Sequence, residues 1–216
     1  MSTLLSVQTG RPLARAHADG QWLSSIYKSP IATPLRLDPL NLDGDEQADL
    51  TVHGGPDKAV CVYSADHFAY WQTTLERPEL GPGAFGENFT VSGLDETTVC
   101  LGDVFAIGTV LVEVSQPRSP CWKLGRKWDR LDLPKLVLRA GKTGWYFRVR
   151  QPGVVAPGQD IRLVERPCAQ WTITEVNRVA YAKKTADMRA ARRELASCPA
   201  LSASWRADLG DLGVRS

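Results

Sequence analysis

The stretch VLVEVSQPRSPC, residues 110–121, says more about the fold of this chain than any other. Its first half, Val110–Ser115, is rich in β-branched residues and predicts a β-strand. Its second half contains Pro117 and Pro120, which exclude a helix and leave two backbone positions without an N–H donor. We therefore expect a strand that ends in a stiff loop, and this loop presents Arg118 and Cys121.

The side chains of that loop indicate an anionic neighbour. Arg118 can offer planar, bidentate hydrogen bonds to an oxyanion. Its positive charge, three residues before Cys121, favours the thiolate, which is the form of cysteine that attacks a substrate or binds a metal. A buried structural thiol near a turn is the alternative, because free cysteines are often simply buried. The local residues leave both interpretations open.

Short segments with strand character recur on both sides of this stretch, separated by Gly, Pro and Asp. Only two helices are predicted among them. One runs from Ala65 to about Leu75 after a capping Ser64, and the other follows a capping Asp132 and ends at Gly141. Many short strands with few helices indicate a mainly β fold, a closed or nearly closed β-barrel. The expected strands are Leu4–Gln8, Ala59–Tyr63, Asn88–Val91, Val104–Ile107, Val110–Ser115, Gly144–Arg150 and Asp160–Val164.

Beyond Pro167 the pattern changes from strands to helices. Thr172-Ile173-Thr174-Glu175 has the spacing of a capping box at the start of a helix. A second helix is expected over Ala186–Ala196, and a third from around Pro199 to near Gly210. We therefore predict two domains, a barrel over residues 1–166 and a small three-helix domain over residues 167–216. The second has about fifty residues, too few to build a deep core alone.

Several cysteines and tryptophans are expected to serve packing. Cys61 lies in the apolar run Val60-Cys61-Val62 and is expected in the core. Trp122 and Trp145 are expected to pack where the barrel meets the helices, with a place in a pocket wall as the alternative. Three further cysteines stand at the ends of predicted elements, with nothing near them in the sequence to activate them: Cys100, Cys168 and Cys198.

Composition is that of an ordinary globular protein. The 216 residues are 43% hydrophobic and 23% charged, and the formal net charge of +2 is too small to indicate nucleic acid or membrane binding. An apolar run of about 18 residues, which a membrane span requires, is not found, and the N-terminus does not resemble a signal peptide. Five widely spaced cysteines argue against a disulfide scaffold and indicate reduced thiols in a cytoplasmic protein.

Two glycine-containing motifs are candidate ligand loops. In the first, His53-Gly54-Gly55-Pro56-Asp57-Lys58, two glycines let backbone amides approach a ligand, Lys58 supplies a charge and His53 a proton or a donor. The second, residues 81–89, ends in Glu87-Asn88-Phe89 before a strand, and Glu87 and Asn88 could contact a polar ligand. A tight turn and a connecting loop are the structural alternatives.

Other functional classes fit less well. The first motif lacks the spacing of a P-loop, the three histidines are isolated from one another, and neither a serine-hydrolase elbow nor a Rossmann fingerprint occurs. A cysteine hydrolase that uses Cys121 with His53 as its base, or a plain redox thiol at Cys121, stays open on chemistry alone.

Read in order, these motifs resemble the MOSC domain family, which takes its name from the C-terminal domain of molybdenum cofactor sulfurases. Within that family, the chain resembles the stand-alone bacterial YiiM type. The resemblance covers roughly residues 5–165, and the helical tail is similar to the three-helix extension of that type. The motifs are Gly44–Asp49, His53–Ala59, Phe85–Asn88, Ser115–Cys121 and Thr143–Trp145.

The resemblance implies a MOSC-type β-barrel with a pocket for the molybdenum cofactor, a pyranopterin of the molybdopterin form. Cys121 falls on the family's cysteine and would be the thiolate ligand to molybdenum, a role that suits a soft sulfur ligand. Arg118 would hold the anionic cofactor nearby, and Lys58, where many members have Arg, would meet its phosphate or the substrate. The expected catalytic residues are Cys121, Arg118 and His53. The expected cofactor-binding residues are His53, Gly54, Gly55, Lys58, Glu87, Asn88, Arg118, Ser119 and Cys121.

The function implied by the resemblance is the reduction of N-hydroxylated compounds, such as N-hydroxylated purine bases, to amines, which detoxifies base analogues. Glu87, His53 or Asp57 could relay the protons. Because no flavin, haem or iron–sulfur motif is visible, electrons are expected from a separate reductase, and a cofactor-delivery protein is a further possible partner. The alternative is a cofactor carrier or sulfur-transfer module that binds the same cofactor without turning over a substrate.

Overall fold

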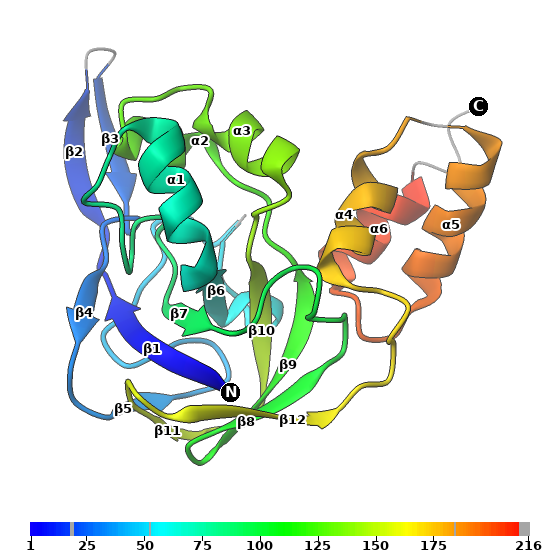
Figure 1. Cartoon of the computed structure of the whole chain (residues 1–216), viewed down its shortest axis with the longest axis horizontal. Coiled ribbons are helices and arrows are strands. Elements are labelled where there is room, and N and C mark those ends of the chain that lie inside the picture. The colour runs from blue at the N-terminus through cyan, green and yellow to red at the C-terminus, as the bar shows by residue number, and fades with distance from the viewer. Residues whose placement is uncertain (18–19, 52, 184, 212–216) are drawn as a thin grey trace.

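The computed structural model describes residues 1–17, 20–51, 53–183 and 185–211 and contains the predicted β-barrel (Figure 1). Seven strands follow one another in the order β12-β8-β9-β10-β6-β7-β1, and the barrel closes because β1 also pairs with β12. β4 adds to the outer edge of β1, and two small sheets, β2–β3 and β5–β11, lie beside the barrel. The strands are β1 (Ser2–Thr9), β2 (Leu13–His17), β3 (Gly20–Ser24), β4 (Ser29–Ile31), β5 (Leu35–Leu37), β6 (Val60–Ser64), β7 (Phe89–Ser92), β8 (Val104–Ile107), β9 (Val110–Pro117), β10 (Trp145–Gln151), β11 (Gly153–Val155) and β12 (Asp160–Glu165).

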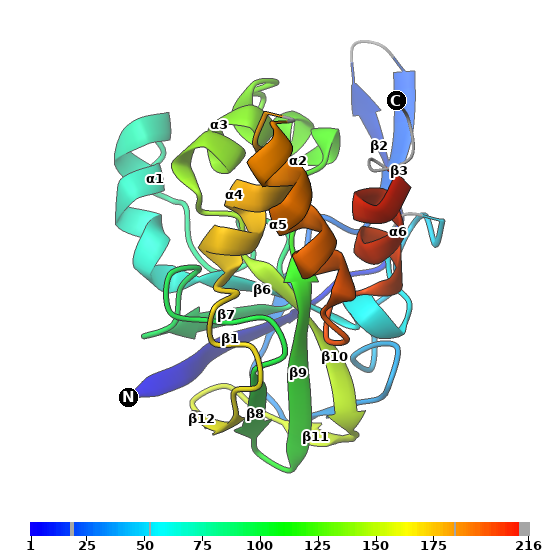
Figure 2. The same cartoon turned by 90° about the vertical axis from the view of Figure 1, so that its right-hand side faces the viewer.

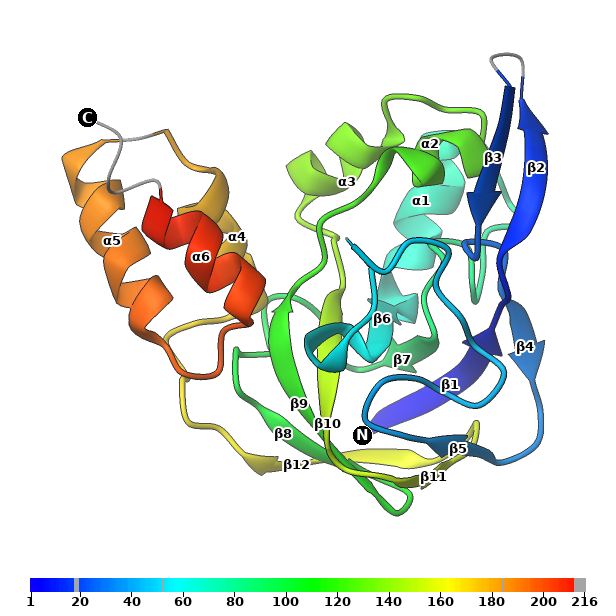
Figure 3. The same ribbon diagram turned by 180° about the vertical axis from the view of Figure 1, so that it is seen from behind.

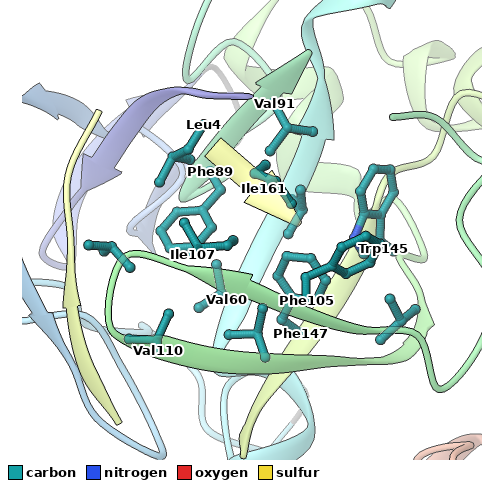
Figure 4. Packing of buried hydrophobic residues seen from close by; sticks show 14 of the residues in the cluster. Leu4, Val60, Phe89, Val91, Phe105, Ile107, Val110, Trp145, Phe147 and Ile161 are labelled. Carbon is teal, nitrogen blue, oxygen red and sulfur yellow. The ribbon is translucent and has the colours of Figure 1, made fainter. Parts of the chain in front are cut away.

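The barrel interior is filled by apolar side chains that alternate with outward-facing residues along its strands (Figure 4). Phe89, Phe105, Trp145 and Phe147 are its largest members, and each is nearly or fully buried. Neighbouring barrel strands are antiparallel except β6 and β7, which run parallel with Val62 opposite Phe89. Because the interior is packed with side chains, a ligand site has to lie at an end of the barrel.

Helices on one end of the barrel build a second apolar cluster (Figure 1). Trp71, Phe85, Leu124 and Val137 meet there around Tyr63, which stacks on Phe85 with ring centroids 4.2 Å apart. The helical elements before β12 are η1 (Pro56–Lys58), η2 (Ala65–His67), α1 (Phe68–Leu75), α2 (Trp122–Lys127) and α3 (Leu133–Ala140).

Three further helices follow β12 and group together on one side of the barrel, α4 (Ile173–Tyr181), α5 (Ala186–Ser197) and α6 (Ala203–Asp211) (Figures 2 and 3). They share a third apolar cluster that includes Leu101 of the barrel and Trp171, Val179 and Leu195 of the segment. Backbone hydrogen bonds join the two parts, from Leu101 N to Trp171 O (2.8 Å) and from Ser202 N to Ser115 O (3.0 Å). The predicted domain boundary near residue 167 stays a prediction, and residues 212–216 of the predicted second domain lie outside the described residues.

All seven predicted barrel strands are present, as are the helices predicted after Ser64 and Asp132. Asp132 does precede α3, but its carboxylate bonds the Arg130 guanidinium (2.6 Å) instead of capping a helix N–H. Trp122 was expected in a packed boundary and is 53% exposed, whereas Trp145 is fully buried. The prediction for Trp122 was therefore wrong, because α2, which the sequence did not indicate, turns its first residue outward.

Candidate functional site

A pocket lies where the loops around η1, the end of β9 and the start of α2 converge. Its empty space, including the solvent in its opening, is about 670 Å³. The lining residues come from widely separated parts of the chain. They are Ser24, Ser25, Ile26, Lys28, Asp45, Glu46, Gln47, Ala48, His53, Gly54, Lys58, Cys61, Gly86, Asn88, Arg118, Ser119, Cys121, Lys123 and Tyr146.

The loop after β9 brings Arg118, Ser119 and Cys121 into the pocket together. The Arg118 backbone N–H donates to Gly144 O (3.1 Å), which ties this loop to the start of β10. Cys121 is half-buried and stands directly before α2, in an extended conformation, with its side chain making no cap hydrogen bond. The two prolines thus end β9 as predicted, and the thiol is left facing the pocket.

Arg118 is a fixed cation in the pocket wall. Its side chain is 6% exposed, and its guanidinium donates to Phe85 O. Burial opposes the charge, but groups near Arg118 that are negative when ionised, Glu87 among them, raise its pKa. The guanidinium therefore stays charged and can meet an anion beside the Cys121 thiol.

The His53–Lys58 loop reaches the pocket with some of its residues. His53, Gly54 and Lys58 line it, and Gly55 does not. Gly54 has φ +81°, and a Cβ there would lie 2.8 Å from Gln47 Oε1, so only glycine fits without moving the Gln47 side chain. Burial lowers the pKa of His53, and the charges of Lys123, Lys58 and Arg118 lower it further.

Asp57, one of the expected proton carriers, does not line the pocket. Its carboxylate pairs with Arg148 (2.7 Å) and accepts from the backbone N–H of Ala203 (3.1 Å), while its carbonyl accepts from Ser115 Oγ (2.5 Å). Asp57 therefore joins η1 to β10, β9 and α6.

Glu87 also lies behind the pocket wall rather than in it. It is fully buried, and its carboxylate accepts from Gly83 N (2.6 Å), Phe85 N (3.0 Å) and Thr90 Oγ1 (2.8 Å). These three bonds use its oxygens to shape the glycine-rich loop before β7. Of the three side chains expected to relay protons, His53 alone lines the pocket.

Asn88 lines the pocket and at the same time bridges three segments. Its amide nitrogen donates to Asp45 Oδ2 (2.9 Å) and Gln8 O (3.2 Å), and its oxygen accepts from Cys61 N (3.1 Å). With both ends of the amide occupied, Asn88 holds the wall in place and presents little unused hydrogen-bonding capacity to a ligand.

Among the lining residues that were not predicted as site residues are Lys28, Asp45, Lys123 and Tyr146. Lys28 and Asp45 form a buried ion pair on the pocket wall. Asp45 lies within one of the motifs that carry the family resemblance, and Tyr146 directly follows another, so both had a signal in the sequence. Lys28 and Lys123 had none, since nothing local distinguishes them from surface lysines.

Cys61 was expected to be a core residue, and it is buried but also lines the pocket. The Tyr146 phenol is a neighbour of this thiol in the lining. Burial raises the pKa of both groups, so the phenol and this thiol are neutral. The inner part of the pocket therefore holds the Cys121 thiol, a fixed guanidinium and a neutral phenol.

The pocket suits an anionic ligand. The charge of Lys28 is balanced by Asp45, and the lining also contains the cations Arg118, Lys58 and Lys123 and one further carboxylate, Glu46. Ser25 Oγ is buried in the lining without a hydrogen-bond partner among the described residues. An unpartnered hydroxyl in a cation-lined cavity is what a polar, anionic ligand would satisfy.

The structure is a closed β-barrel with a pocket among its loops and a helical extension. The chain belongs to the MOSC domain family, whose model matches residues 49–162, and a YiiM-like 3-alpha helix domain model matches residues 171–211. These matches confirm the resemblance drawn from the sequence motifs. Among the helices of the described residues, none is long and apolar enough to span a membrane.

Similar proteins include bacterial and fungal ones. Protein YiiM of Escherichia coli (strain K12) is 40% identical over 203 residues, which are 93% of this chain and 88% of that protein. A protein named "Reductase" from Gibberella moniliformis is 37% identical over 185 residues, 83% of this chain but 32% of the fungal protein. The crystal structure of YiiM from Geobacillus stearothermophilus superposes with a TM-score of 0.83 at 39% identity, covering 99% of this chain and 100% of that one.

Proposed function

We propose that this protein binds the molybdenum cofactor through Cys121 and reduces N-hydroxylated compounds, such as N-hydroxylated purine bases, to amines. The observation that carries the proposal is the Cys121 thiol beside the buried Arg118 guanidinium in a cation-lined pocket, in a chain of the MOSC domain family. A cytoplasmic setting, in which the Cys121 thiol stays reduced, is part of the proposal.

The residues present fit this cofactor. Cys121 is a half-buried thiol in the lining, and it would supply the one protein thiolate to a metal that the pterin dithiolene carries. Arg118, Lys58 and Lys123 would balance the negative charge of the dithiolene and phosphate, with Ser119 and the Gly54 backbone beside them.

The net reaction is R–NHOH + 2e⁻ + 2H⁺ → R–NH₂ + H₂O. When bound, the cofactor would supply the two-electron redox chemistry. The residues of this chain would position the substrate and deliver the protons that the reaction consumes. His53 lines the pocket, and its lowered pKa leaves it neutral at pH 7, so its imidazole can accept a proton from solvent and pass it inward. The Tyr146 hydroxyl keeps its proton and can donate a hydrogen bond to a bound group.

Electrons would come from a separate reductase, because the sequence shows no second redox motif. The fungal relative is named "Reductase", and the part that matches this chain is 32% of its length.

Molybdenum and pterin per chain test the cofactor part of the proposal. Protein from a cofactor-producing host is compared with Cys121→Ser, and Cys100→Ser, a buried thiol outside the pocket, is the matched control. We expect close to one metal and one pterin in the wild type and the control, and loss of metal in Cys121→Ser. Absence of both from the wild type, in a host that loads another molybdoenzyme, would remove the proposal and leave Cys121 as a plain thiol.

Turnover then tests the reductase part. The loaded protein is mixed with an artificial reductant and an N-hydroxylated purine base, and the amine is quantified. We expect amine to form only with loaded protein. Loaded protein that leaves the base untouched but passes its cofactor rapidly to an apo-enzyme would favour a carrier instead.

A further inference from the structure

Two buried cysteines of the helical segment lie side by side. Cys168 stands between β12 and α4, and Cys198 ends α5, thirty positions further along the chain. Their sulfur atoms are 3.3 Å apart. In the sequence, nothing near either thiol could activate it. In the folded chain, each of the two thiols is the other's neighbour.

The backbone on both sides of this pair is held in place. Cys168 O accepts from Trp171 N (2.9 Å), and Cys198 is held by bonds from its own N–H to Leu195 O (3.0 Å) and from Leu201 N to its carbonyl (3.1 Å). A disulfide has an S–S length of about 2.05 Å, so the sulfurs need to approach by only a little more than 1 Å.

The surroundings favour a bond between the sulfurs over a metal site. The nearest further thiol, Cys100, directs its Sγ to Ala169 O (3.5 Å). Within the described ranges, no cluster of three or more His, Cys, Asp or Glu side chains could hold a metal ion. The pair lies in the apolar cluster with Trp171, Leu195 and Leu201, and such surroundings exclude large reagents.

We propose that Cys168 and Cys198 are a site of covalent modification, an intramolecular disulfide formed by a small two-electron oxidant of the peroxide class. One thiolate attacks a peroxide oxygen, which breaks the O–O bond and yields a sulfenic acid and water. The second thiol then displaces water from the sulfenic acid and forms the S–S bond. In sum, 2 R–SH + H₂O₂ → R–S–S–R + 2 H₂O, so the sulfurs lose two electrons and the peroxide gains them.

The bond would fasten the start of α4 to the end of α5. Closing so many residues into one covalent loop restricts the unfolded chain and stabilises the folded segment. Burial raises the pKa of Cys168 to about 12, helped by its hydrogen bond with Cys198, so the thiolate is scarce at neutral pH and bond formation is slow. The proposal does not depend on the molybdenum cofactor or on the proposed reductase activity.

Mass spectrometry of the intact, folded chain tests the pair. Reduced protein is treated with a small excess of hydrogen peroxide, remaining thiols are alkylated, and the chain is digested without reduction. We expect a linked peptide that contains Cys168 and Cys198 in the wild type and in Cys100→Ser, and no such peptide in Cys168→Ser or Cys198→Ser. Alkylation of both thiols after complete reaction of Cys121, or a link from either one to Cys100, would overturn the proposal.

Thermal unfolding gives a second measurement, which compares each protein with and without peroxide and therefore still applies if a serine variant folds poorly. Peroxide-treated wild type should melt several degrees above the reduced protein, and dithiothreitol should reverse the change. Cys198→Ala keeps the site apolar and should show no upward shift with peroxide. An equal upward shift in Cys198→Ala would show that the stabilisation has another origin and would count against the pair.

Discussion

Glu87 accepts hydrogen bonds from Gly83 N, Phe85 N and Thr90 Oγ1 while fully buried. In Glu87→Gln one amide N–H would face a backbone donor, leaving a buried group unsatisfied. We expect a loss of about 2–3 kcal/mol in the free energy of unfolding, measured by urea denaturation. The same change at the exposed Glu46 should stay within about 0.5 kcal/mol. Equal losses at the two sites would contradict the role given to the Glu87 carboxylate.

Lys127 is a half-buried cation whose Nζ donates to Ile26 O (3.1 Å) and Gly83 O (2.6 Å). Burial lowers its pKa from 10.5 to about 8, partly opposed by Glu87. Between these two values the unfolded chain holds the proton that the folded chain has released, so stability rises with pH.

We therefore expect the free energy of unfolding of the wild type, relative to Lys127→Met, to increase by up to about 3 kcal/mol as the pH rises from 8 to 10.5. Urea denaturation across that range measures the difference. Lys135→Met, an exposed position in α3, is the control and should give a flat difference. A flat difference for Lys127→Met as well would show that the half-buried charge does not titrate in this window.

Single residues also mark how far the pocket could be predicted. Arg118 and Cys121 could be predicted from the sequence because two prolines place them on a short loop. Glu87 resembles a site residue in sequence, but only tertiary structure shows that backbone donors take both of its oxygens. Lys28 reaches the pocket because Asp45, seventeen positions away, pairs with it, and no local pattern encodes that distance.

At the scale of elements, the start of β10 depends on Gly144. Its φ is +73°, and a Cβ there would lie 2.2 Å from Val62 O in the paired strand β6. Gly144→Ala should therefore force β6 and β10 apart and lower the free energy of unfolding by roughly 3 kcal/mol or more. Gly141→Ala is the matched control, because φ is +67° and nothing lies within 4 Å of the added Cβ. It should lose about 1–2 kcal/mol, and an equal loss for the two variants would contradict the steric explanation.

The elements that sequence reasoning missed have physical reasons. β4 contains Pro30 at its centre, which normally argues against a strand. α2 contains Gly125, which is unfavourable in a helix, but a Cβ there would lie 2.9 Å from Arg130 O, so the following turn requires it. α6 was expected from around Pro199 and begins at Ala203, where Ser202 Oγ accepts from Trp205 N (3.3 Å). The barrel strands were predictable because β-branched and aromatic residues alternate there between clear turns.

For the whole molecule, Asp103 joins the barrel to the helical segment. It is fully buried and accepts two hydrogen bonds from Arg166 (2.6 and 2.8 Å) and one from Cys100 N (2.9 Å). Asp103→Asn weakens this junction. We expect the amides of Leu101 and Ile173, which bond across it, to exchange with solvent at least about tenfold faster, with little change in β10.

Hydrogen exchange followed by mass spectrometry or NMR measures that effect. Glu175→Gln removes the more exposed pair with Arg178 and serves as the control, for which we expect no change at the junction. Faster exchange at every site in Asp103→Asn, β10 included, would show that Asp103 supports the whole fold rather than the junction.

Barrel closure through the pairing of β1 with β12 also governs how the molecule meets other copies of itself. An open sheet exposes unpaired N–H and C=O groups along its outer strands, and neighbouring chains can add to them as in amyloid. In the main sheet β4 is left as an outer strand, three residues long, and Pro30 at its centre offers no N–H for such pairing. The closed barrel and its short outer strand therefore also protect the main sheet from aggregation by strand addition.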